Sequence, residues 1–188
     1  WTAGTSLLVD GALITQGSYA AVIKDHVGIT VTLKNVVTMN TRQGIFLEWN
    51  AASTITVSDS SVDCASNALV LRDLDDSTVA VTNVQASGAL GLSFSSGCDG
   101  TTFAISGGSF TGTSHGMRAH TAFSNGALTI SGSTFVTTDA AAGNAVYFTH
   151  TADNHITAPF PIVMKDIAMR GGNNGILFDK ALTALDFT

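Results

Sequence analysis

Apolar and polar residues alternate in short segments that recur along the chain about every 24 residues. Gly44-Ile45-Phe46-Leu47 and Ala68-Leu69-Val70-Leu71 are two such segments, in which a small residue is followed by apolar residues at alternate positions. Similar segments begin at Gly91, Gly116, Ala145 and Gly175. Successive side chains of a β-strand point to opposite faces, so alternate residues share one face. The pattern predicts a series of short strands that bury one face in a common core.

A second set of strands shows the same alternation half a repeat away. The expected core residues of the first set are Ile45, Leu47, Leu69, Leu71, Leu92, Phe94, Met117, Val146, Phe148, Ile176 and Phe178. Those of the second set are Val31, Leu33, Ile55, Val57, Val79, Val81, Phe103, Ile105, Leu128, Ile130, Ile162 and Met164.

A glycine, asparagine or aspartate follows each strand of the second set. These residues are Gly11, Asn35, Asp59, Asn83, Gly107, Gly132 and Asp166, separated by 24, 24, 24, 24, 25 and 34 positions. Glycine, asparagine and aspartate adopt left-handed backbone conformations at low cost, as a sharp turn requires. The column therefore predicts a stack of turns.

Together these columns predict an all-β fold, a right-handed single-stranded parallel β-helix (a β-solenoid) of about seven rungs of about 24 residues. We expect one domain over residues 1–188, as a segment of a larger protein or assembly, with an inserted loop over 150–161 where the turn spacing lengthens.

The small-apolar-x-apolar strands, the turn residues and the period resemble the pectin-lyase-like superfamily of right-handed β-helices. The resemblance implies the fold and carbohydrate as a recurring partner. It does not imply one activity, because the superfamily includes phage tailspikes, surface proteins, and polysaccharide lyases and hydrolases. It favours an extracellular, cell-surface or virion location.

Ser114-His115-Gly116 resembles the Gly-His-Gly motif of polygalacturonase-type hydrolases. One repeat earlier, where that family has a pair of aspartates, this chain has Gly91-Leu92, and no Arg-x-Lys motif follows. These departures disfavour a conventional polygalacturonase and favour an ordinary turn residue at His115.

Charge and composition narrow the function further. Charged residues make up 12% of the chain, the net charge is −6, and the eight Lys and Arg form no cluster, which disfavours nucleic-acid binding. The sequence contains no run of 18 apolar residues, so it predicts no membrane-spanning helix. Cys64 and Cys98 are either two small buried residues or a disulfide.

The acidic turn Arg72-Asp73-Leu74-Asp75-Asp76 is the first candidate site, with Asp99 about one rung above Asp76. Carboxylates one rung apart, at about 5 Å, could share a proton, bind Ca²⁺ or act as acid and nucleophile on a sugar. Asp73, Asp75, Asp76 and Asp99 are therefore the catalytic candidates. The alternative is a solvated turn, and we expect no cofactor, because no further feature supports Ca²⁺.

The outward face of the first strand set is the second candidate site. One outward column contains Phe46, Val70, Arg118 and Tyr147, and another contains Trp49 and His150. Stacked aromatic side chains would contact sugar rings or another subunit, unless a neighbouring loop covers them. The candidate contact residues are Phe46, Trp49, Arg72, Arg118, His120, Tyr147 and His150. Between the columns, Lys24, Glu48 and Arg72 form a charge ladder that is expected to be solvated.

The insertion at 150–161 is the third candidate. His150, Asp153 and His155 are possible ligands of a transition metal, but the His-x4-His spacing is meaningful only on a helix, and this segment precedes Pro159. We predict no metal site, and expect a surface loop or a contact with a partner or glycan.

These features favour a structural or adhesive module of a tailspike-like or fibre-like assembly, whose partners are further subunits and polysaccharide. The alternative is a carbohydrate-active enzyme, a polysaccharide lyase or glycoside hydrolase, that uses the carboxylate cluster.

Overall fold

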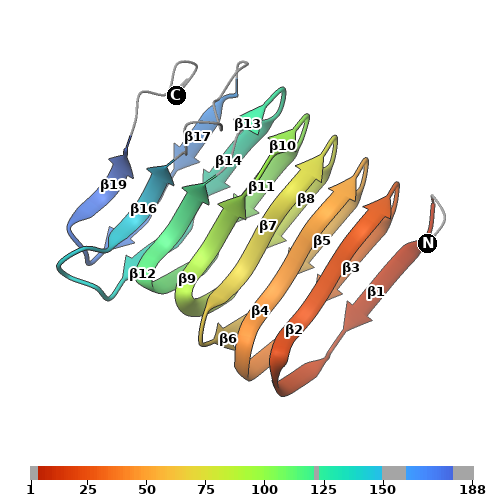
Figure 1. Ribbon diagram of the computed structural model, residues 1–188, viewed down its shortest axis with the longest axis horizontal. Helices are drawn as coiled ribbons and strands as arrows, with labels where there is room; N and C mark the ends of the chain where they lie inside the picture. The colour runs from red at the N-terminus through yellow and green to blue at the C-terminus, as the bar shows by residue number, and fades with distance from the viewer. Residues whose placement is uncertain (1–3, 121–122, 150–159, 180–188) are drawn as a thin grey trace.

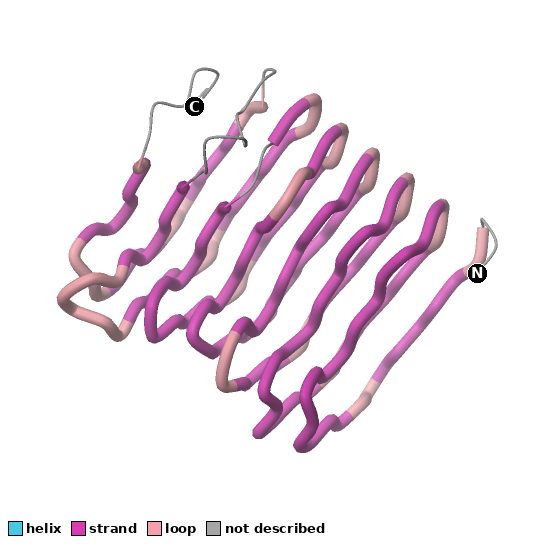
Figure 2. Tube along the Cα trace, in the orientation of Figure 1, coloured by secondary structure: helices cyan, strands magenta, loops and turns pink. Residues whose placement is uncertain are grey.

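The computed structural model describes residues 4–120, 123–149 and 160–179. Within these ranges the chain forms strands and no helix, and every pair of neighbouring strands is parallel (Figures 1 and 2). Successive passes of the chain lie side by side along the long axis of the molecule. The predicted all-β parallel β-solenoid is confirmed. No helix within the described residues is long and apolar enough to cross a membrane.

Sheet A contains one short strand from each pass. Its strands, in spatial order, are β1 (Ser6–Asp10), β3 (Thr30–Lys34), β5 (Thr54–Ser58), β8 (Thr78–Thr82), β11 (Thr102–Ser106), β14 (Ala127–Ser131) and β17 (Ile162–Lys165). None of its six pairings contains a register shift.

Sheet B contains strands of more varied length, from three to fifteen residues. They are β2 (Leu13–Val27), β4 (Val37–Ala51), β6 (Ser61–Cys64), β7 (Asn67–Asp75), β9 (Gln85–Ser95), β12 (Ser109–His120), β15 (Thr134–Thr137), β16 (Asn144–Thr149), β18 (Ala168–Arg170) and β19 (Asn174–Phe178). A third, two-stranded sheet pairs β10 (Cys98–Asp99) with β13 (Phe123–Ser124).

The number of turns is smaller than expected. Sheet A has seven strands, but only the five from β3 to β14 have a neighbouring strand on both sides. The solenoid therefore has about five turns. The expectation of about seven rungs is too high because it includes the first and last passes, which pair on one side only. The right-handed sense of the coil stays a prediction.

The predicted turn column is confirmed. All seven of its residues, from Gly11 to Asp166, have a left-handed backbone, with φ between 49° and 74°. A second left-handed column, which the sequence analysis does not predict, precedes the strands of sheet A. It consists of Gly4, Gly28, Ala52, Asp76, Gly100 and Asn125, with φ between 48° and 83°. Each of β3, β5, β8 and β11 is thus enclosed by two sharp turns, which hold its length at five residues.

Buried hydroxyl groups brace both sets of turns. The backbone N–H groups of Ile29, Ser53 and Ser77 donate to the side-chain oxygens of Ser53, Ser77 and Thr101, at 3.3, 3.1 and 3.1 Å. At the other end of sheet A, the N–H of Val36 donates to Ser60 Oγ at 3.1 Å. These ladders satisfy buried backbone donors and tie each pass to the next.

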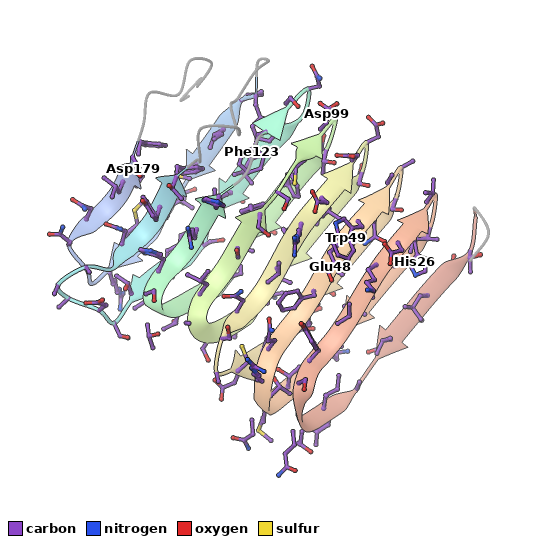
Figure 3. The ribbon with its side chains drawn as sticks, in the orientation of Figure 1. His26, Glu48, Trp49, Asp99, Phe123 and Asp179 are labelled. Carbon is purple, nitrogen blue, oxygen red and sulfur yellow. The ribbon has the colours of Figure 1, made fainter. Side chains whose placement is uncertain are left out.

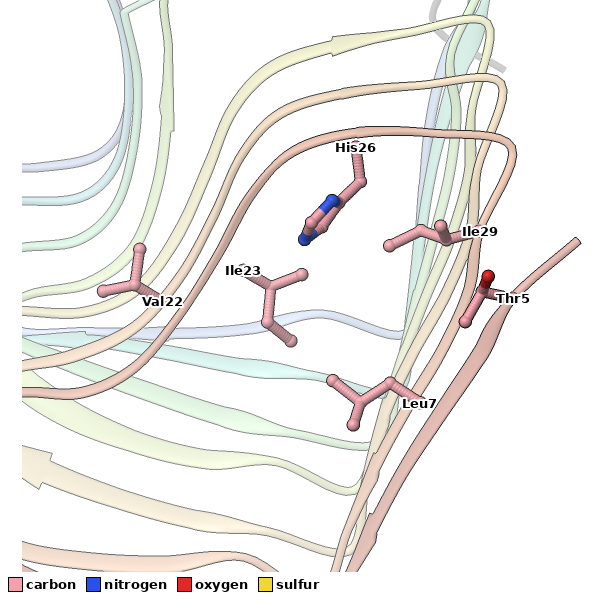
Figure 4. A pocket seen from close by; sticks show the side chains of 6 residues that line it. All are labelled: Thr5, Leu7, Val22, Ile23, His26 and Ile29. Atoms are coloured by element: carbon pink, nitrogen blue, oxygen red, sulfur yellow. The ribbon is translucent and has the colours of Figure 1, made fainter. Parts of the chain in front are cut away.

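The core lies between the two sheets and matches the predicted residues closely. All of them are buried except Met164, Ile176 and Phe178, which are partly exposed because they belong to the last pass. At the first pass, Leu7, Ile23 and Ile29 point toward one another around an open hollow of about 160 Å³, while Val22 points to the other side of its strand (Figure 4).

Candidate functional site

A row of charged side chains crosses three strands of sheet B. Lys24, Glu48 and Arg72 occupy matching positions on β2, β4 and β7. Arg72 Nη1 lies 3.7 Å from Glu48 Oε2, and Arg72 Nε lies 3.4 Å from Asp73 Oδ2. The Glu48 side chain is only 11% exposed. The row is therefore a partly buried ion-pair network at Glu48, and not the solvated ladder that the sequence predicts.

Trp49 lies beside Glu48 (Figure 3) and contacts two cations of this row. Lys24 Nζ is 5.4 Å and Arg72 Cζ is 5.3 Å from the centroid of its ring. These two cations come from β2 and β7, the strands that pair with β4 on either side of Trp49. Cation–π attraction to Lys24 and Arg72 stabilises the indole in this position. Trp49 is nevertheless 44% exposed, as predicted.

The backbone at Trp49 is left-handed, with φ of 54°. Matching residues of other passes, Asp25, Asp73 and Ser96, are left-handed as well. Aspartate tolerates this conformation, whereas it strains a bulky aromatic residue. The surrounding strands therefore hold Trp49 in a conformation that it would not adopt alone, as is common at binding sites.

An open hollow of about 360 Å³ lies next to Trp49. It is lined by Trp49, Asn50, Ala51, Asp73 and Asp75. The predicted contact residue Trp49 and two of the predicted catalytic carboxylates therefore meet at one place on the surface. Their combination of an aromatic side chain with hydrogen-bond acceptors is suited to a polar, ring-shaped ligand.

The carboxylates of this region are also part of the turn structure. The N–H of Gly97 donates to Asp73 Oδ1, and the N–H of Asp99 donates to Asp75 Oδ1, both at 3.1 Å. Asp99 therefore lies over Asp75, and not over Asp76 as the sequence analysis expects. The reason is that the true period at this point is 24 residues; the left-handed Asp76 instead donates its N–H to the carbonyl of Asp99, at 2.7 Å.

Asp99 is held in its charged form. The Ser124 hydroxyl, at 2.6 Å, and the Asn125 amide, at 2.8 Å, donate to its Oδ1 and lower the pKa of Asp99, with a smaller contribution from the Gly100 N–H. A general acid for glycoside cleavage needs the opposite shift. This environment suits a carboxylate that stabilises a turn.

The outward apolar column is largely covered. Phe46 is 8% exposed and packs edge-on against Tyr19, with ring centroids 5.1 Å apart; Val70 and Ser93 are buried as well. The expectation that Phe46 is an exposed contact residue is therefore wrong. Strand β4 is fifteen residues long, and the Tyr19 ring from β2 covers the outward side of Phe46.

The remaining predicted contact residues form a separate group toward the other end of the stack. Arg118 and Tyr147 are in register on β12 and β16 and are half-buried. The Tyr147 hydroxyl donates to Asp179 Oδ2 at 3.1 Å. His120 is half-buried at the end of β12. His150, Asp153 and His155 lie outside the described residues.

His115 stabilises a connection between strands. Its Nδ1 accepts a hydrogen bond from the Asn144 N–H at 3.1 Å, and its ring lies 4.9 Å from that of Tyr147. Burial, and then the nearby Arg118 charge, lower the pKa of His115. The residue is therefore neutral at physiological pH and acts as an acceptor.

The two cysteines are buried and unpaired, which confirms the first of the two alternatives. Burial raises the pKa of Cys64. Within the described ranges, no group of three His, Cys, Asp or Glu side chains is arranged to hold a metal ion.

The outward residues of sheet A, where threonine predominates, were not among the sites predicted from the sequence. The sequence feature that identifies this surface is the Thr-x-Thr spacing of Thr30 and Thr32, which recurs 24 residues later at Thr54 and Thr56. These residues form a surface separate from the Trp49 hollow, on the other sheet.

No protein-family model matches this chain, and neither the curated proteins nor the solved structures include a chain similar to it. The resemblance to the pectin-lyase-like superfamily therefore stays an expectation from the sequence.

Proposed function

We propose that this chain is a structural and adhesive β-solenoid module of an extracellular or virion assembly that contacts glycans at the hollow beside Trp49. The observation that carries the proposal is Trp49 itself. Its ring contacts Lys24 and Arg72, is 44% exposed and borders the hollow that contains Asp73 and Asp75. A rigid aromatic group loses little conformational freedom when it binds a ligand.

The charges around the hollow favour a neutral sugar over an acidic one. Arg72 is already paired with Glu48 and Asp73, and Lys24 lies 3.9 Å from Asp25. The lining carboxylates of Asp73 and Asp75 would repel a uronate but accept hydrogen bonds from sugar hydroxyls. The exposed part of the Trp49 side chain would contact the sugar.

Assembly with further subunits is supported by the first pass of the solenoid. Leu8, Leu13 and Val27 point outward and are 67%, 64% and 61% exposed. In the next pass the matching residues are Thr32 for Leu8, Val37 for Leu13 and Ala51 for Val27, and in the pass after that Ser61 and Asp75 replace the last two. A replacement of Leu8 by Thr and Leu13 by Ser is expected to reduce self-association in light scattering, with Thr32→Ser as a control.

Glycan contact is tested by affinity electrophoresis in gels that contain a neutral polymer, such as galactomannan or dextran, or the acidic polymer polygalacturonate. We expect a neutral polymer to retard the protein, and Trp49→Ala to weaken retardation about fivefold or more. Tyr147→Phe is the control, because it changes an aromatic residue far from the hollow.

Equal retardation of wild type and Trp49→Ala would contradict the proposal, as would the absence of retardation by every polymer. Release of oligosaccharides from a polymer, if abolished by Asp75→Asn, would instead establish the enzymatic alternative.

A further inference from the structure

The outward side of sheet A is a regular array of small side chains, which we call the threonine face. It comprises the outward residues of β3, β5, β8, β11 and β14: Thr30, Thr32, Lys34, Thr54, Thr56, Ser58, Thr78, Ala80, Thr82, Thr102, Ala104, Ser106, Ala127, Thr129 and Ser131. All of them are exposed or half-exposed. Eight are threonine, three are serine and three are alanine, so nearly every position carries a hydroxyl or a methyl group.

The spacing of this array is uniform in two directions. The five strands pair in strict register, for example Thr30 with Thr54 and Thr54 with Thr78. Neighbouring strands are about 4.8 Å apart, and alternate residues of one strand are about 6.7 Å apart. The threonine face is thus a lattice of hydroxyl and methyl groups with two fixed repeats.

The array is also rigid. Left-handed turns enclose the strands, and the buried hydroxyl ladders of Ser53, Ser77 and Thr101 tie the passes together at one end of sheet A. Threonine is branched at Cβ, so its side chain has few accessible rotamers on a strand. Little conformational entropy would be lost when this face meets an ordered partner.

The charge of the face points to a neutral partner. Lys34, at the border, is the one charged residue of the fifteen, and no carboxylate is among them. All ion pairs of the described residues involve Lys24 or Arg72 of sheet B. Nucleic acid, an anionic membrane or an acidic polymer would find no complementary charge here.

The size of the face argues against a protein partner. Five strands of five residues cover about 19 Å by 13 Å, roughly 250 Å², from the standard strand dimensions. A stable protein–protein interface needs about 800 Å² on each partner. An extended crystalline surface, by contrast, contacts every position of a small regular array at once.

We propose that the threonine face binds ice. The two repeats of the array are close to those of water molecules in crystal planes of ice, and each hydroxyl both donates and accepts hydrogen bonds. Water held between the hydroxyl rows and around the methyl groups is restricted in orientation. This ordered layer matches the outermost layer of the crystal and merges with it.

Binding is measured as partition of the purified chain into a slowly growing ice hemisphere and as thermal hysteresis of single ice crystals. Wild type is expected to be enriched in the ice and to shape the crystals. Thr56→Lys places a long charged side chain at the centre of the array and is expected to abolish both effects. Thr111→Lys, the same change on an outward position of sheet B, is the matched control and should behave as wild type.

A second variant keeps the test independent of any loss of folding. Ala80→Thr combined with Ala104→Thr fills two gaps of the column that contains Thr32, Thr56 and Thr129, and is expected to increase thermal hysteresis. Circular dichroism checks that all variants retain the wild-type strand content.

Three results would overturn the proposal. The first is exclusion of the wild type from ice, and the second is an equal effect of Thr56→Lys and Thr111→Lys on ice binding. The third is that the wild type binds crystalline cellulose or chitin but does not partition into ice, and that Thr56→Lys abolishes the polysaccharide binding. The last result would assign the face to a crystalline polysaccharide. Trp49→Ala should leave ice binding unchanged, so this test and that of the glycan hollow fail separately.

Discussion

The two large sheets share one period but accommodate irregular sequence differently. Sheet A has no register shift in any pairing, whereas sheet B has shifts between Thr38 and Thr41 and between Gly112 and His115. The single extra residue that lengthens the spacing from Gly107 to Gly132 is absorbed between Gly112 and His115. Within the described residues, both of these register shifts thus lie in sheet B.

This difference separates two kinds of surface. Sheet B carries single side chains such as Trp49, where the matching positions of other passes share the left-handed backbone but are occupied by Asp25, Asp73 and Ser96. The regular passes of sheet A produce a surface whose properties belong to the whole array and not to any single residue. Substitutions should therefore act locally on sheet B and collectively on sheet A.

A core residue shared by both sheets should have the largest effect. Phe103 points inward from β11 and contacts Phe94 of β9 and Phe123 of β13, with ring centroids 5.1 and 6.2 Å apart. We expect Phe103→Ala to lower the free energy of unfolding by about 3–5 kcal/mol, measured by chemical denaturation. Leu8→Ala, at an exposed position, is the control. A loss below that of the control would mean that the two sheets do not depend on this packing.

A glycine in sheet B should be less replaceable than one in a turn of sheet A. A Cβ on Gly44 of β4 would lie 1.9 Å from the Ala68 carbonyl oxygen, whereas a Cβ on Gly132 would have no heavy atom closer than 3.9 Å. Gly44→Ala is expected to cost about 3 kcal/mol through backbone displacement. Gly132→Ala should cost about 1 kcal/mol through its left-handed conformation alone. Equal losses in thermal denaturation would contradict this ranking.

One turn next to sheet A can be made more stable by a single substitution. Ala52 has a left-handed backbone, with φ of 49°, at a position where Gly28 and Gly100 occur in other passes. Ala52→Gly relieves this strain but makes the unfolded chain more flexible, for a net gain of about 0.5 kcal/mol. The expected rise in Tm is about 1–2 °C in calorimetry. Ala51→Gly, within β4, should instead lower Tm.

The smallest expected effect is a dependence of stability on pH at His115. Because the pKa of His115 is lowered in the folded chain, the unfolded chain binds the proton first, near pH 6.5. Stability contributed by neutral His115 is therefore present above this pH and is lost as pH falls toward the folded pKa. Denaturation of wild type and His115→Asn at pH 7.5 and 5.5 measures the difference, and identical pH dependence in the two proteins would exclude it.

The repeat allowed much of the architecture to be predicted. Gly11, Asn35 and the other turn residues were identifiable because their spacing is constant and their residue types share one conformational property. The core followed from the same period, since alternation assigns each residue to a face.

Features that depend on the path of a single pass could not be predicted. The burial of Phe46 depends on Tyr19 of the neighbouring pass, and a pattern of alternating residues carries no information about such a contact. The contact of Trp49 with Lys24 and Arg72 depends on side-chain directions at a left-handed residue. The second turn column was hidden because Ala52 does not favour such a backbone.

The 24-residue spacing of the turns also makes the length of the protein adjustable. Residues 54–77 form one complete unit that begins with β5 and ends before β8, and its neighbours present matching registers on either side. Removal or duplication of such a unit would shorten or lengthen the stack by one strand spacing, about 4.8 Å, without new kinds of contact. Duplication or deletion of the gene segment that encodes one unit would therefore change the length of the solenoid in uniform steps.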